Sequence, residues 1–132
     1  MIRVLRIINR FNLGGPTYNA TYLTAYLPDS YETKLIGGVH EEHEGESTFI
    51  LDNHNVQYEL LIETQREVSF AADRKAMKRI REIIREFQPD VVHTHASKAG
   101  FLCRVAAYKE NVPVIVHTFH GHVFHSYFGR LK

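Results

Sequence analysis

Short apolar runs alternate with segments of helical periodicity along most of the chain. A β-branched run at residues 2–8 predicts a first strand, and apolar residues at helical spacing predict a helix from Pro16 until Pro28 interrupts the pattern. Two more strands are predicted at residues 32–36 and 56–62, with a polar stretch and one helical turn between them. The first half therefore has the order strand, helix, strand, strand.

The clearest helix is predicted at residues 73–87, where the apolar side chains fall on one face and the basic ones on the other. A strand at 91–95, a helix that starts at Ser97 and a strand at 114–119 follow. Parallel strands need long, right-handed crossovers, so this alternation predicts an α/β fold: a three-layer Rossmann-like unit with a mostly parallel sheet and strand order of about 3-2-1-4-5.

Composition narrows the class of protein. A length of 132 residues fits one domain, and 16 basic against 15 acidic residues leave a net charge of +1, so no nucleic-acid partner is expected. The basic face of the 73–87 helix is interpreted as an ordinary solvated surface. Weak peripheral contact with a membrane is a minor alternative. The single cysteine, Cys103, is expected to be buried in a helix.

The amino-terminal stretch MIRVLRIINRF has too short an apolar run for a signal peptide or a membrane span. We therefore expect a cytoplasmic protein, with the inner membrane face as a peripheral alternative.

Unusual residues follow three of the predicted strands, at the edge where ligands bind in such sheets. Gly14 and Gly15 open the first helix, where backbone amides could hold phosphate or sugar oxygens, and Thr17 follows in the same turn. This is not a GxGxxG motif, which weakens a dinucleotide reading. His95, with Ser97 and Lys98 at the next helix start, offers an imidazole, a hydroxyl and an ammonium group.

The segment HTFHGHVFHSYF at residues 117–128 holds four of the nine histidines. It could be a metal site, a catalytic or sugar-binding loop, or a chance enrichment. The pairs His93/His95 and His120/His122 have the spacing for a shared ion, but no acidic residue lies in 113–132, so no metal is predicted. His93 and His117 lie inside strands and are expected to be structural.

Three motifs together resemble a known family. NRFNLGGPTYNATYLTAYL, PDVVHTHASKAG and VPVIVHTFHGHVFH look like the amino-terminal Rossmann-like domain of glycosyltransferase family 4, retaining nucleotide-sugar transferases of the two-domain GT-B fold. The resemblance implies that Gly14 and Gly15 lie under the donor phosphates and the acceptor. It also implies that His120 contacts the donor sugar at the reaction centre, as the catalytic residue. Gly121 would let the ligand approach, and His122 would shape the loop or touch the acceptor.

The resemblance also implies a domain organisation. Residues 1–132 would be the acceptor-side domain, truncated and without the carboxyl-terminal nucleotide-binding domain, so the chain alone is expected to be inactive. The substrates would be a nucleotide sugar and a glycan, lipid or small-molecule acceptor, and no cofactor is expected. Two alternatives stay open: a non-catalytic assembly module that partners a separate nucleotide-binding chain, and a nucleotide-sugar epimerase relative.

Overall fold

The fold is a parallel sheet with helices on both faces. The computed structural model describes residues 1–11, 13–38, 47–61, 70–95 and 97–120. Within these ranges the elements follow in the order β1 (Ile2–Arg10), α1 (Gly15–Ala25), β2 (Tyr31–Gly38), α2 (Thr48–Asn53), β3 (Tyr58–Leu60), α3 (Phe70–Phe87), β4 (Val91–His95), α4 (Ser97–Lys109) and β5 (Val114–Thr118).

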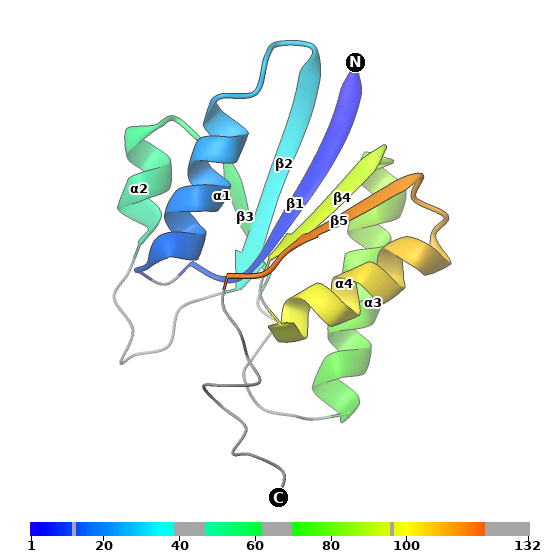
Figure 1. Cartoon of the computed structure of the whole chain (residues 1–132). Coiled ribbons are helices and arrows are strands. Elements are labelled where there is room, and N and C mark those ends of the chain that lie inside the picture. Colours follow the sequence, from blue (N-terminus) through cyan, green and yellow to red (C-terminus); the bar gives the residue numbers. More distant parts are fainter. Residues whose placement is uncertain (12, 39–46, 62–69, 96, 121–132) are drawn as a thin grey trace, which may run out of the picture.

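The described strands form one five-stranded sheet in the order β3-β2-β1-β4-β5, and every neighbouring pair is parallel (Figure 1). The predicted strand order and fold class are thus confirmed. The predicted boundaries differ in places: β1 and β2 are longer than expected, β3 is shorter, and α3 begins three residues earlier, at Phe70. The single helical turn expected before β3 is the six-residue helix α2.

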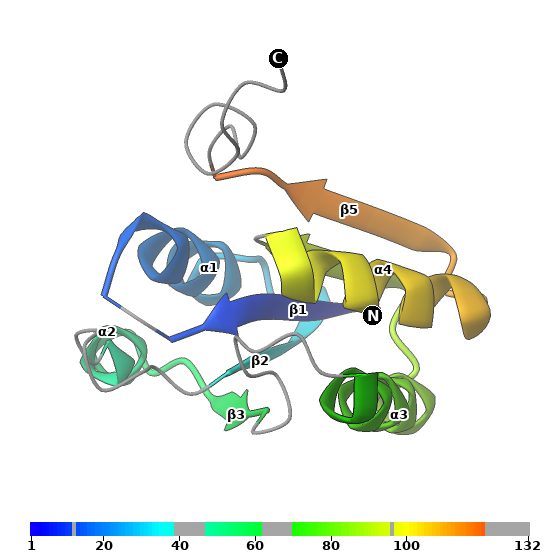
Figure 2. The same cartoon turned by 90° about the horizontal axis from the view of Figure 1, so that it is seen from below.

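Two hydrophobic clusters lie on opposite faces of the sheet, as the end-on view suggests (Figure 2). One packs α1 and α2 against β1 and β2 through residues such as Ala20, Leu35 and Leu51. The other packs α3 and α4 against β1 and β4 and includes the predicted apolar face of α3. Cys103 belongs to this second cluster and is fully buried, and its burial raises the pKa of the thiol.

The edge strand β5 is much less covered than the strands in the middle of the sheet. Leu5 and Ile7 of β1 are fully buried, whereas Val114, Ile115 and Val116 of β5 are 47%, 36% and 41% exposed. Within the described ranges, no helix is both long and apolar enough to cross a membrane.

Candidate functional site

The site candidates meet at the carboxyl edge of the sheet because all described strands are parallel. β1 leads into the start of α1, β4 leads into the start of α4, and β5 ends at Thr118, two residues before His120 (Figure 1). From β1 the strand order runs to β2 and β3 on one side, and the second half of the chain adds β4 and β5 on the other side. In open α/β folds, ligands bind at the carboxyl edge where the strand order reverses in this way. The predicted clusters therefore lie at one edge.

The structure brings two of the predicted site residues into direct contact. Nδ1 of His95 and Nε2 of His120 are 2.8 Å apart and share a hydrogen bond. His95 is fully buried at the end of β4, whereas His120 is exposed. His95 thus lies beneath His120 and does not face solvent, so its effect on a ligand would pass through His120.

The surroundings of His95 indicate which atom of each ring carries the proton. Its second nitrogen, Nε2, is buried and has no hydrogen-bond partner among the described residues. Buried N–H groups without an acceptor are rarer than buried acceptors without a donor. We therefore place the proton of His95 on Nδ1, from which it is donated to Nε2 of His120. His120 then carries its own proton on Nδ1 and can offer it to a ligand.

A second hydrogen-bonded chain crosses the same sheet and was not foreseen as part of the site. Arg6 in β1 donates through Nε to Nδ1 of His93, at a long 3.4 Å, and through Nη1 to Thr24 Oγ1 at 2.6 Å. Because a guanidinium group can only donate, His93 must carry its proton on Nε2, which lies 2.7 Å from Thr118 Oγ1. The one sequence signal was a charged residue inside an apolar strand.

These groups share an environment that disfavours positive charge. Burial lowers the pKa of His93 to about 4 and that of His95 to about 3, and nearby basic groups add to both shifts. Burial also lowers the pKa of Arg6 to about 10, and no described carboxylate is paired with it. Both histidines are therefore neutral at pH 7, while Arg6 keeps its charge.

His93 and His117 lie inside strands and are hydrogen-bonded, as predicted, but both are half-buried. His117 Nδ1 is 2.7 Å from Thr94 Oγ1, and its ring packs so closely on α4 that a Cβ at Gly100 would lie 2.5 Å from Cε1. The ring of His117 thus fills space between β5 and α4.

The glycine-rich turn is open at the start of α1. Gly14 occupies the capping position, Gly15 is the first helical residue, and no described side chain caps the helix. A Cβ added at Gly15 would meet no described atom within 4 Å, and neither glycine has a φ in the left-handed region. The fold therefore does not require Gly15. Thr17 is fully buried, which leaves its side chain turned away from solvent.

Other candidates are described only in part. Ser97 and Lys98 open α4 as predicted, at the carboxyl edge, but Gly121 and His122 lie outside the described residues. In the H-x-H pair of β4, the rings of His93 and His95 have centroids 4.3 Å apart. Across the described ranges, no group of three or more His, Cys, Asp or Glu residues is arranged to hold a metal ion.

Comparison with known proteins identifies the class of protein to which this chain belongs. The fold is the Rossmann-like α/β unit found in GT-B glycosyltransferases and nucleotide-sugar epimerases. Residues 14–132 match the model of Glycosyltransferase Family 4, which covers most of the chain. The chain belongs to this family.

One curated relative is UDP-Gal:alpha-D-GlcNAc-diphosphoundecaprenol alpha-1,3-galactosyltransferase from Escherichia coli, 41% identical over 61 residues, which are 46% of this chain and 16% of that protein. A glycosyltransferase from Rickettsia africae shares the fold with a TM-score of 0.68 at 19% identity, over 92% of this chain and 30% of that one. UDP-GlcNAc 2-epimerase from Neisseria meningitidis, bound to UDP-GlcNAc, gives a TM-score of 0.64 at 16% identity, over 88% and 32%. The chain thus spans less than a third of the length of each of these proteins.

Proposed function

We propose that this chain is the acceptor-side domain of a retaining glycosyltransferase that uses a UDP-sugar donor. The observation that carries the proposal is the hydrogen bond between His120 and the buried, neutral His95 at the carboxyl edge of the sheet. The family match over residues 14–132 supports it. Support for a UDP-sugar comes from the E. coli relative, whose name gives UDP-Gal as its donor.

In this proposal His120 binds the donor sugar. Its Nδ1–H donates a hydrogen bond to a sugar hydroxyl, while Nε2 is held by His95. The bond from the sugar's anomeric carbon to the diphosphate breaks as the acceptor oxygen bonds to the same face, and the acceptor proton passes to the departing diphosphate. The open start of α1 at Gly14 and Gly15 stabilises the negative charge that develops there, without a metal.

The acceptor is proposed to be a sugar on a lipid diphosphate, as in the name of the E. coli relative. The epimerases share the fold at low sequence identity, so the likeness does not indicate that this chain catalyses epimerisation. An epimerase would release the altered sugar without an acceptor, so product analysis distinguishes the two activities.

Substitution of His120 tests the proposal in a complete enzyme that carries this domain. His120→Ala should lower kcat/KM at least tenfold, which corresponds to about 1.4 kcal/mol of transition-state stabilisation, and should leave the Tm nearly unchanged, because the side chain is exposed and water can replace it as the acceptor for His95. His117→Ala is the matched control and should do the reverse. It should lower stability by roughly 1–3 kcal/mol through the lost ring and the orphaned Thr94 hydroxyl. If His120→Ala unfolds the protein and His117→Ala only slows it, the assignment is wrong.

A further inference from the structure

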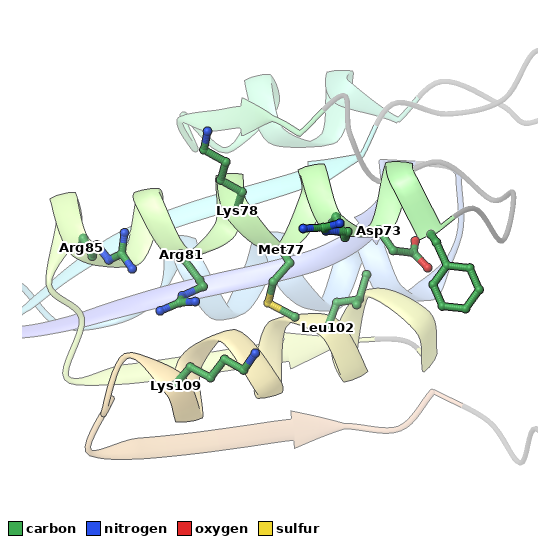
Figure 3. A pocket seen from close by; sticks show the side chains of 9 residues that line it. Asp73, Met77, Lys78, Arg81, Arg85, Leu102 and Lys109 are labelled. Atoms are coloured by element: carbon green, nitrogen blue, oxygen red, sulfur yellow. The ribbon is translucent and has the colours of Figure 1, made fainter.

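A groove between α3 and α4 lies outside the site described above. It encloses about 510 Å³ and has an apolar floor, where Met77 of α3 and Leu102 of α4 point towards each other (Figure 3). Its rim carries five cations and one carboxylate, Asp73. The cations are Arg74, Lys78, Arg81, Arg85 and Lys109.

Only part of this positive charge is neutralised within the described chain. Arg81 and Arg85 both pair with Glu110, at 2.5 and 2.8 Å. Arg74, Lys78 and Lys109 pair with no carboxylate among the described residues. Of these three, Lys78 is exposed to solvent and points away from α4 (Figure 3). The groove is therefore a basic surface whose cations are only partly neutralised by described carboxylates.

Large apolar side chains are exposed on the same two helices. Phe70, the first residue of α3, is 91% exposed, and Phe101 and Tyr108 of α4 are 60% and 78% exposed. Phe101 and Tyr108 are seven residues apart and therefore lie on the same side of α4. Because α3 and α4 both start at the carboxyl edge of the sheet, Phe70 and Phe101 lie towards the edge that bears His120.

We propose that the outer surface of α3 and α4 docks on an anionic phospholipid bilayer. Lysine and arginine side chains are attracted to acidic headgroups, while exposed aromatic rings enter the interface between headgroups and acyl chains. A nucleic-acid backbone offers charge but no hydrocarbon for Phe70, Met77 and Leu102, so the mixed surface favours lipid. The inference does not rest on the proposed transfer reaction, since vesicle binding requires no turnover.

The test is co-sedimentation of the purified chain with vesicles of phosphatidylcholine, with and without phosphatidylglycerol. Binding should require phosphatidylglycerol and should weaken strongly between about 0.05 and 0.15 M salt. Arg74→Gln/Lys78→Gln should weaken it roughly tenfold or more, because each cation near the surface adds to the attraction. The double variant Phe101→Ser/Tyr108→Ser should lower the fraction of protein that stays bound to the vesicles at high salt.

A charge-matched control separates the surface from net charge. Asn53→Glu/Gln57→Glu also lowers the net charge by two, but at exposed positions near α2 and β3, at the far edge of the sheet. This variant should bind vesicles almost as the parent does. Equal loss in both double variants, equal binding to neutral vesicles, no binding to acidic ones, or tighter retention on a DNA duplex would each overturn the proposal.

Discussion

The starts of α1 and α4 occupy equivalent places in the fold but differ in what surrounds them. Each helix follows a parallel strand at the carboxyl edge, and each has a glycine in or near its first turn. At Gly15 a Cβ would project into open space, whereas at Gly100 it would collide with the ring of His117. One glycine is therefore required by packing, and the other is left free for a ligand.

The packed helix start should give the largest loss of stability. Gly100→Ala should lower the free energy of unfolding by roughly 1–3 kcal/mol, because the new Cβ forces the His117 ring to move and breaks its bond to Thr94. In a His117→Ala background the same substitution should become neutral or slightly stabilising, since the space is then empty and alanine favours the helix. Denaturant unfolding of the two single variants and the double variant measures the coupling. Additive effects would show that Gly100 and His117 do not meet.

The next effect concerns the buried histidine under the start of α4. The pKa of His95 in the folded chain is about 3, below the ordinary value of 6.5, so below pH 6.5 the unfolded chain binds a proton that the folded chain refuses. The contribution of His95 should thus be complete above pH 6.5 and fall by up to about 1.4 kcal/mol per pH unit as the pH drops towards 3, and His93, with a pKa of about 4, should add a second contribution of the same sign.

Unfolding measured at pH 7, 6 and 5 checks this slope. Besides burial, the basic side chains near His95 that help to lower its pKa are His93, His120, Arg6 and His117. His95→Asn should remove about half of this slope, and His93 should account for most of the remainder. A slope unchanged in His95→Asn would assign the acid sensitivity to another group.

The smallest effect on stability is expected at the open helix start. Gly15→Ala should stabilise the chain, by up to about 1 kcal/mol, because alanine restricts the unfolded chain and its Cβ meets nothing in the described structure. In a complete enzyme the same methyl group should raise KM for the nucleotide sugar, since it occupies the space proposed for the ligand. Unchanged kinetics in Gly15→Ala would remove this turn from the proposed site.

The fold followed from the sequence more fully than the site did. Strand order came from the alternation of β-branched runs and helical periods, and the apolar face of α3 was read directly from its spacing. The ends at Phe70 and Arg10 differ from the predicted ones because local patterns define the ends of helices and strands only to within a few residues. The contact of His95 with His120 joins two residues 25 positions apart in sequence, and the side-chain partners of Arg6 lie on two other elements, β4 and α1. Sequence placed these residues at one edge but did not pair them.

The burial of Cys103 turns the only cysteine into a reporter of opening. Its thiol is fully enclosed between α4 and the sheet and, with its raised pKa, is almost entirely protonated near neutral pH. A thiol reagent must therefore wait until α4 separates from the sheet before it reacts. The labelling rate of the unmodified protein measures how often this helix detaches, so no engineered probe is needed to follow the dynamics of the layer that carries the basic groove.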